Sequence, residues 1–476
     1  MGNQKKLGFF SLIAIVIGSM IGGGAFNLAS DMSSGANAGA IIIGWAVTGI
    51  GIVALGLSFQ NLAVRKPELE GGIYSYAKEG FGSFMGFNSA FGYWLSAWLG
   101  NIAYATLMFS AIGYFFKTFD GGQNMASVVG ASVMLWLVHA LVLRGVHSAA
   151  LVNLVTTIAK LIPVLLFIII GIFAFNIDQF TADFWGKGGA AFEWSSVGQQ
   201  VKSTMLVTLW VFIGVEGAVV LSGRAENKKD VGRATVIGLV GTLFIYVLVS
   251  LLSLGIMSNS ELAGLENPSM AYVLEHIVGK WGAALINAGL IISLLGAWLG
   301  WTLLAAEIPY IAAKDHVFPK WFAKENKNKA PTHSLWLTNS LIQVFLLTFL
   351  ISDKPYNFAF SLASSAILLP YLFSALFQLK ISLTGNGYAV TESRTKDIIL
   401  GIVSSIYAIW LVYAAGMEYL LLTMVLYAPG IIVYMIAEKE AQKKKYFGKS
   451  ELAVAFAIFL LAVWAIIELF TGAIEI

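Results

Sequence analysis

Long apolar runs, separated by short polar segments, recur from one end of this 476-residue chain to the other. Hydrophobic residues make up 58% of it and charged residues only 12%, which is not the composition of a soluble domain. A run of about 18 or more apolar residues can cross a bilayer as a helix. We therefore predict an all-α polytopic protein in contact with the lipid bilayer. The predicted spans, about thirteen in number, are 8–30, 39–60, 83–115, 126–143, 149–175, 204–222, 234–257, 282–312, 334–352, 357–380, 397–416, 419–437 and 452–474.

The distribution of Lys and Arg predicts how these spans are oriented. Most of the 29 Lys and Arg residues lie in loops that share a side with the N-terminus. Because cytoplasmic loops carry the excess of positive charge, we expect a cytoplasmic N-terminus in a plasma membrane. The thirteenth span then places the C-terminus outside. The exceptions in outer loops are Lys117, Lys187, Lys202, Lys280 and Lys354.

A glycine-rich stretch, Gly18-Ser19-Met20-Ile21-Gly22-Gly23-Gly24, interrupts the first apolar run. Each Gly costs roughly 1 kcal/mol relative to Ala in a helix, so a continuous helix is disfavoured here. A break at membrane depth exposes N–H and C=O groups that lipid cannot satisfy, so it must be buried or line a cavity. Secondary transporters build substrate sites from such broken helices. The alternative is close helix packing through small residues.

A second interruption is predicted in the sixth span, where Gly214 and Gly217 flank Glu216. Two units that start five spans apart have opposite orientations in the membrane, which is typical of an inverted repeat with a shared midplane site. We predict a transport core over 1–380, with repeats at about 8–175 and 204–380. Spans 11–13, in 397–476, would be peripheral.

Three ionisable residues inside predicted spans are candidates for gating or coupling. A carboxylate in hydrocarbon is costly, so Glu216 suggests a cation site, a gate, a proton carrier or a buried ion pair. Glu307 could face the cytoplasmic vestibule or be structural. Lys160 lies near the middle of its span. It could replace a bound sodium ion, exchange a proton, or pair with a backbone carbonyl or a glutamate.

Aromatic and polar residues deep in the spans are further candidates, although each alone is more typical of packing. Aromatic faces attract ammonium and guanidinium groups. A lone buried Asn usually makes a hydrogen bond between helices. The residues are Tyr93, Trp98, Asn101, Trp210, Trp301 and Ser365. Gly300 beside Trp301 would allow a neighbour to approach closely.

Other function classes have little support in the sequence. The chain has no cysteine, its five histidines are not spaced as a metal pair, and its formal net charge is only +3. We therefore expect no metal, no cofactor and no nucleic-acid partner. No nucleophile–base pair and no phosphate-binding loop stands out, so we predict a transporter rather than an enzyme.

Five segments resemble one known family. They are 18–26 (GSMIGGGAF), 71–77 (GGIYSYA), 93–103 (YWLSAWLGNIA), 209–216 (LWVFIGVE) and 300–305 (GWTLLA). Together they are similar to the basic amino acid/polyamine antiporters of the amino acid–polyamine–organocation superfamily. Segment 65–72 (RKPELEGG) and the extra last span resemble the arginine/ornithine antiporters in particular.

The resemblance implies a leucine-transporter-type 5+5 inverted-repeat fold and a set of substrate contacts. It implies a carboxylate site at the amides around Gly22, Gly23 and Gly24, with Ser19 in the same motif, and an α-amino site at the break near Trp210 and Ile213. The substrate side chain would lie against Tyr93, Ala97, Asn101, Trp301 and Ser365, and Glu216 would belong to the inner gate. Two positions depart from related arginine/agmatine exchangers. These carry serine where Gly23 stands, so the carboxylate contact would depend more on backbone, and Tyr104 also differs.

We therefore predict a secondary antiporter that works by alternating access and exchanges arginine for ornithine. The alternatives are an exchanger of an amino acid for its decarboxylated amine, an agmatine/putrescine exchanger, and a proton-coupled symporter that uses Lys160. An ion channel would need a continuous pore instead of a closed midplane site. By analogy with the family, a homodimer is expected.

Overall fold

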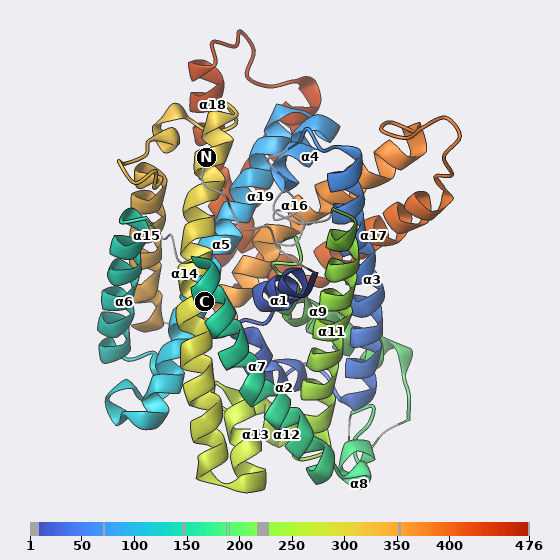
Figure 1. Cartoon of the computed structure of the whole chain (residues 1–476), viewed down its shortest axis with the longest axis vertical. Coiled ribbons are helices and arrows are strands. Elements are labelled where there is room, and N and C mark those ends of the chain that lie inside the picture. The colour runs from blue at the N-terminus through green and yellow to red at the C-terminus, as the bar shows by residue number, and fades with distance from the viewer. Residues whose placement is uncertain are drawn as a thin grey trace. The chain divides into compact units, whose positions relative to one another are not determined.

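The computed structural model describes residues 9–69, 72–145, 149–186, 188–189, 191–216, 228–350 and 354–474 (Figure 1). In this part of the chain, nine helices are long and apolar enough to cross a bilayer. The protein is therefore an all-α polytopic membrane protein. The nine are α3 (Ala38–Arg65), α5 (Ser83–Phe115), α6 (Met125–Leu143), α11 (Lys228–Leu254), α14 (Lys280–Lys314), α16 (Pro355–Thr384), α17 (Thr395–Ala414), α18 (Met417–Glu440) and α19 (Lys449–Thr471).

Each of the thirteen predicted spans contains helix, but four of them are covered by helices other than these nine. The first holds α1 (Phe9–Met20), a 3-10 turn η1 (Gly24–Phe26) and α2 (Leu28–Ser33). The others hold α7 (Ala149–Ala174), α9 (Trp194–Phe212), and α15 (Thr332–Leu346) with η5 (Leu347–Leu350). The count of thirteen membrane crossings stays a prediction.

The boundaries differ most where loops were predicted. The loop before the sixth span holds α8 (Ile177–Thr181) and the first residues of α9, so the predicted start at 204 is wrong. Other predicted loops hold α4 (Ile73–Phe81), η2 (Lys117–Gly122), α12 (Asn259–Ala263), α13 (Ser269–Val278) and η4 (Lys320–Ala323). These helices are too short to give the long apolar runs on which the prediction depended.

The chain divides into two compact units. Unit 1 comprises Met1–Leu57, Tyr104–Gly130 and Ser148–Ala297, and unit 2 comprises Ser58–Ala103, Ala131–His147 and Trp298–Ile476. Four of the five unit boundaries therefore fall inside helices, namely α3, α5, α6 and α14. Neither unit coincides with a predicted five-span repeat.

In unit 1, the short helix α1 packs against α7 and α11, and these three helices lie side by side in Figure 1. Leu12 of α1 and Ala234 of α11 are both buried and belong to one hydrophobic cluster. The continuation of the first span, α2, packs against α11, α12 and α13. Both parts of the broken first span are therefore enclosed by protein, as backbone exposed at a break requires.

In unit 2, α16 packs against α4, α17 and α18, and α18 packs against α19. The last helix, α19, contacts the first turn of α5 through Glu451. One oxygen of this carboxylate accepts the N–H of Phe84 at 2.9 Å, and the other accepts the N–H of Gly448 at 2.8 Å. The first N–H groups of a helix have no partner within the helix, so one side chain caps two helices here.

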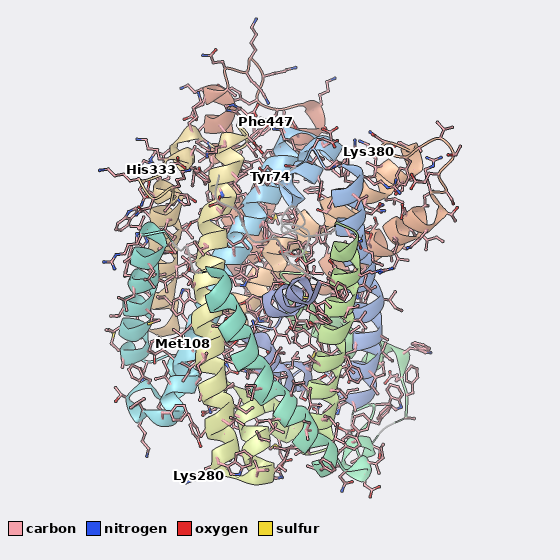
Figure 2. All side chains as sticks on the ribbon, in the orientation of Figure 1. Tyr74, Met108, Lys280, His333, Lys380 and Phe447 are labelled. Atoms are coloured by element: carbon pink, nitrogen blue, oxygen red, sulfur yellow. The ribbon has the colours of Figure 1, made fainter. Side chains whose placement is uncertain are left out.

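Four segments predicted to face the cytoplasm lie toward the same end of unit 2. Figure 2 shows Tyr74, His333, Lys380 and Phe447 in the upper part of the view, each from a different predicted cytoplasmic segment. The segment that holds Tyr74 is linked to two of the others. The Tyr74 hydroxyl donates to Asp315, in the segment that leads to His333, at 2.6 Å. Lys380 donates to the carbonyl of Gly80, in the segment that holds Tyr74, at 2.7 Å. The predicted grouping of these loops on one side agrees with this arrangement.

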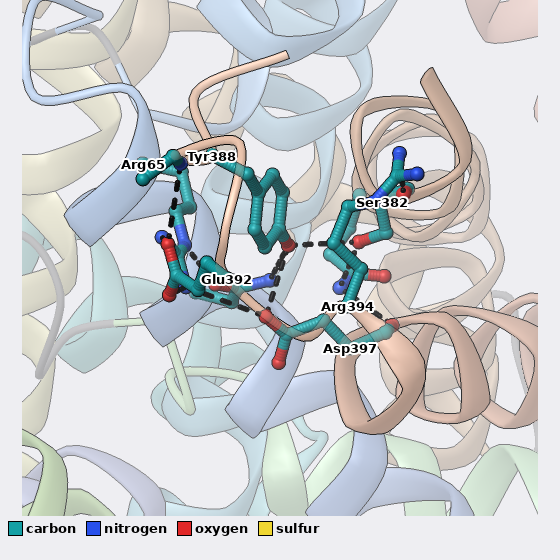
Figure 3. Close-up of polar contacts among 9 residues, drawn as sticks. Arg65, Ser382, Tyr388, Glu392, Arg394 and Asp397 are labelled. Atoms are coloured by element: carbon teal, nitrogen blue, oxygen red, sulfur yellow. Dashed lines mark hydrogen bonds and ion pairs between the residues drawn. The ribbon is translucent and has the colours of Figure 1, made fainter. Parts of the chain in front are cut away.

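At the end of α3, Arg65 forms a polar cluster with the segment between α16 and α17 (Figure 3). Two guanidinium nitrogens contact the two carboxylate oxygens of Glu392, with Nη1 at 2.7 Å from Oε2. The guanidinium also lies over the Tyr388 ring, 4.0 Å from its centroid. The Tyr388 hydroxyl donates to Asp397 at 2.9 Å. A bidentate arginine–carboxylate pair fixes orientation as well as distance, so it holds this loop to α3.

Candidate functional site

The glycine-rich stretch interrupts the first span as predicted. Helix α1 ends at Met20, and the chain continues through η1 before α2 begins. Among the residues that the structure describes, no acceptor is found for the N–H groups of Gly23, Gly24 and Ala25, whereas Phe26 and Asn27 donate to carbonyls within the break. Three neighbouring amides without acceptors, buried inside the protein, are suited to bind an anionic group.

The sixth predicted span is also interrupted, at a point that contacts the first break. Helix α9 ends at Phe212, and Ile213–Glu216 form a turn in which Gly214 has φ +109°, a conformation that favours glycine. The Ser19 hydroxyl of α1 lies 3.1 Å from the carbonyl oxygen of Gly214. A Cβ added to Gly214 would lie 2.8 Å from the carbonyl oxygen of Ser19. The two breaks are therefore in direct contact, while Gly217 and the rest of the predicted sixth span, up to 222, lie outside the described residues.

Two polar side chains bind the carbonyl end of α1. The buried ammonium of Lys160, on α7, donates to the carbonyl of Gly18 at 2.5 Å. The Tyr246 hydroxyl of α11 lies 2.8 Å from the carbonyl oxygen of Met20 and 2.9 Å from that of Val211 on α9. Carbonyls in the last turn of a helix have no partner within it, so these contacts satisfy groups that the break leaves exposed.

Aromatic rings lie against the glycines of the break. A Cβ added to Gly24 would lie 2.9 Å from Nε1 of Trp210, and one added to Gly22 would lie 3.0 Å from the Tyr104 hydroxyl oxygen. The two rings are tilted against each other, with centroids 5.6 Å apart. Larger residues at either glycine would displace these rings. Glycine is therefore needed here for close packing as well as for the break.

The predicted gating residue Glu216 belongs to the second break. It is 2% exposed, and its Oε2 accepts the N–H of Gly214 at 3.2 Å. Ile213, predicted to offer a carbonyl to an amino group, is also buried. Its N–H bonds back to the carbonyls of Leu209 and Trp210, and no donor to its own carbonyl is found within the described residues. Within the described residues, this carbonyl is an open acceptor at the break.

The residues predicted to contact the substrate side chain lie in unit 2. Tyr93, Ala97 and Asn101 recur every fourth residue along α5, so they lie on one face of that helix, and all three are buried. The Asn101 amide nitrogen is 3.5 Å from the Thr302 hydroxyl. In the described residues, the Asn101 amide oxygen and the buried Ser365 hydroxyl on α16 have no hydrogen-bond partner.

Trp301 lies on α14 beside open space. The residue is half-buried, and no atom lies within 4 Å of a Cβ added to the exposed Gly300. The substrate contact at Trp301 stays a prediction. Glu307, two turns further along α14, is half-buried as well.

The structure thus brings part of the predicted site together within unit 1. That set is Ser19, Gly22, Gly23, Gly24, Lys160, Trp210, Ile213 and Glu216. Tyr93, Ala97, Asn101, Trp301, Glu307 and Ser365 belong to unit 2. No group of three His, Asp or Glu side chains that could hold a metal ion occurs among the described residues.

The family model described as "Amino acid permease" matches residues 7–418. The chain belongs to the amino acid permease family. The resemblance seen in the sequence is therefore confirmed, and this permease is a multi-pass membrane protein.

Relatives of this permease match over nearly their whole length. It is 50% identical over 477 residues to a protein of Pseudomonas aeruginosa named arginine/ornithine antiporter, with 99% of this chain and 98% of that protein covered. It is 44% identical to an arginine/ornithine antiporter of Latilactobacillus sakei, with 98% of each covered. It is 43% identical to an arginine/agmatine antiporter of Chlamydia pneumoniae, with 100% of this chain and 99% of that protein covered.

Sequence reasoning about this permease missed two residues at the first break. Tyr246 looked like one more aromatic in an apolar span. Asn27 accepts the N–H of Ser269 at 3.0 Å and donates to the buried Asp31 at 2.8 Å, which joins α2 to the start of α13. A polar pair four residues apart next to a break was the available signal for Asn27 and Asp31.

Proposed function

We propose that this permease is a secondary antiporter that exchanges a cationic amino acid for a related amino acid or amine, and specifically arginine for ornithine. The observation that carries the proposal is the set of three adjacent amides, of Gly23, Gly24 and Ala25, that lack acceptors in the described residues. Buried amides of this kind need an anionic partner, and the α-carboxylate of an amino acid supplies one.

The second break complements the first. Carbonyl groups at the end of α9, near Ile213, are suited to accept the α-amino group. One amino acid could then bridge the two breaks, which are already in contact through Ser19 and Gly214. Tyr93, Ala97, Asn101, Trp301 and Ser365 are proposed to contact the side chain, which would be the part that distinguishes arginine from ornithine.

The names of the relatives support the choice of substrate. Relatives at 44–50% identity are named arginine/ornithine antiporters, and one at 43% is named an arginine/agmatine antiporter. Arginine and ornithine each carry one net positive charge near neutral pH, so their exchange is electroneutral. The two substrate gradients then drive transport without a coupled ion.

The three ionisable residues of the predicted spans have proposed roles in this exchange. We propose that Lys160 is a fixed cation that replaces a sodium ion at the end of α1, and that Glu216 and Glu307 act on the cytoplasmic path.

The transport core would be 1–380, in two inverted repeats of about 8–175 and 204–380, with 397–476 peripheral. The N-terminus would be cytoplasmic, the C-terminus extracellular and the membrane the plasma membrane. The protein would act as a transporter and not as an enzyme, in a homodimer proposed from the family likeness alone.

Counterflow in proteoliposomes tests the exchange. Vesicles loaded with unlabelled ornithine should accumulate labelled arginine, and empty vesicles should not. Agmatine, putrescine, lysine and histamine inside the vesicles form the comparison panel. No uptake with any internal cationic amino acid would contradict the proposal, whereas faster uptake against agmatine than against ornithine would favour the amino acid/amine exchanger.

The orientation can be tested separately because the chain has no cysteine. Single cysteines at Gly121 and Lys327, in predicted outer and cytoplasmic loops, should react with a membrane-impermeant maleimide in intact and in opened cells, respectively. The reverse pattern would contradict the proposed orientation. Light scattering of the purified protein tests the homodimer, which a monomeric mass would exclude.

A further inference from the structure

Tyr104 places a hydroxyl group beside the first break. The residue is on α5, within unit 1, and only 6% of it is exposed. Its ring is tilted against Trp210, and its hydroxyl oxygen is 3.0 Å from the point where a Cβ on Gly22 would lie. No described residue forms a hydrogen bond with this hydroxyl.

Tyr246 in the same unit differs from Tyr104, because its hydroxyl has hydrogen-bond acceptors in the protein. This hydroxyl lies within 2.9 Å of two carbonyl oxygens. The Tyr104 hydroxyl has no such acceptor among the described residues and is open to a ligand. It lies beside Gly22, the residue before Gly23, Gly24 and Ala25, whose amides also lack acceptors in the described residues.

The packing around Gly23 explains why this hydroxyl comes from α5. Here a Cβ on Gly23 would lie 2.6 Å from Cδ2 of Leu107 and 3.0 Å from Cδ2 of Leu294, so a serine would not fit without a shift of these leucines. The same point is 3.6 Å from Cδ1 of Tyr104. The tyrosine therefore brings a hydroxyl group to the break from the neighbouring helix.

We propose that the Tyr104 hydroxyl donates a hydrogen bond to the α-carboxylate of the substrate, and that this makes the carboxylate a requirement for binding. The inference rests on the proposed function and specifies the selectivity of the same site. Agmatine and putrescine have no carboxylate, so they would leave the hydroxyl and the three amides without the acceptor that an amino acid supplies. Sites built to hydrogen-bond a substrate group strongly reject analogues that lack it. Tyr104 thus selects amino acids over their decarboxylated amines.

Calorimetry on the purified full-length protein tests this with L-arginine and agmatine as paired ligands. The native protein should bind arginine at least about 100-fold more tightly than agmatine. Tyr104→Phe should weaken arginine binding about 10- to 100-fold, the range for a hydrogen bond to a charged group, and leave agmatine binding nearly unchanged. Tyr246→Phe is the matched control, because its hydroxyl has protein acceptors. Any loss of affinity in Tyr246→Phe should be the same for arginine and for agmatine.

Three outcomes would overturn the inference: no preference for arginine in the native protein, unchanged arginine affinity in Tyr104→Phe, or an equal loss for both ligands. If Tyr104→Phe does not fold, 3-fluorotyrosine at position 104 keeps the ring and makes the hydroxyl a stronger donor. The arginine-to-agmatine affinity ratio should then rise, and an unchanged ratio would overturn the inference. Native protein that binds neither arginine nor ornithine would contradict the proposed function itself, which separates the two failures.

Discussion

The Lys160 ammonium is 2.5 Å from the carbonyl oxygen of Gly18, in the last turn of α1. Both groups are buried, and the carbonyl end of a helix carries a partial negative charge that favours a cation. A charged lysine at this place would supply a positive charge where the first helix stops, and this is its proposed role in place of a bound sodium ion.

The first prediction concerns coupling. Arginine–ornithine exchange should proceed without sodium and persist when a protonophore collapses the pH gradient, because Lys160 stays charged throughout. Lys160→Met should reduce exchange strongly, since it leaves the Gly18 carbonyl without its donor at a cost of about 1–3 kcal/mol. Proteoliposome flux measures both effects. Uphill arginine uptake into vesicles without internal substrate, driven by an imposed pH gradient and lost in Lys160→Ala, would instead identify a proton symporter.

The second prediction concerns Gly23. Gly23→Leu should abolish arginine binding by calorimetry, because its side chain would overlap Leu107 and cover the open amides. Gly241→Leu on α11 is the control, since nothing lies within 4 Å of a Cβ added there. The control should bind arginine as the native protein does. If a stable Gly23→Leu protein still bound arginine, this stretch would serve only helix packing.

The third prediction concerns the contact between the breaks. Gly214→Ala should lower stability by about 1–3 kcal/mol, because Gly214 has a positive φ and its new Cβ would press on the Ser19 carbonyl. Gly198→Ala, in the exposed first part of the same helix, should be neutral or stabilising by roughly 0.5–1 kcal/mol. Thermal unfolding in detergent compares the two. Equal unfolding temperatures of Gly214→Ala and Gly198→Ala would show that the turn at Gly214 is not strained by a side chain.

The fourth prediction concerns the polar cluster of Figure 3. The Arg65 guanidinium lowers the pKa of Glu392, so the pair stabilises the fold above the ordinary carboxyl pKa. This contribution is lost as the pH falls through the lowered pKa. Glu392→Gln should therefore lower the unfolding temperature slightly at pH 7, and the difference from the native protein should disappear in acid. Arg65→Lys keeps the charge and should be intermediate. A deficit in Glu392→Gln that did not depend on pH would count against an ionic contribution.

The sequence was sufficient to predict the long helices and the position of the first break. Segment 83–115 was predicted with the bounds that α5 has, because a long apolar run with polar ends has few other solutions. The glycine cluster located the break because local helix propensity alone disfavours continuity there. Short helices such as α4 and α13 were not predicted, since nothing in a polar loop of that length distinguishes a helix of two or three turns.

The polar contacts of the site were harder to predict. Tyr246 contacts carbonyls that are 226 and 35 residues away in sequence, and no local pattern encodes such a pair. The position of the Tyr104 hydroxyl next to Gly22 likewise depends on how two helices pack. Propensity and hydropathy therefore located the broken elements, while the donors and acceptors that complete the site required the tertiary structure.

The carboxylate of Glu451 has a consequence for the order in which the protein is made. It supplies the acceptor for the first turn of α5, yet it is synthesised 367 residues after Phe84. During translation, α5 must enter the membrane and carry Tyr93, Ala97 and Asn101 before this cap exists. The first turn of that helix thus gains its cap only after α19 is made, and a nascent chain arrested before α19 would hold an α5 that is inserted but not yet capped.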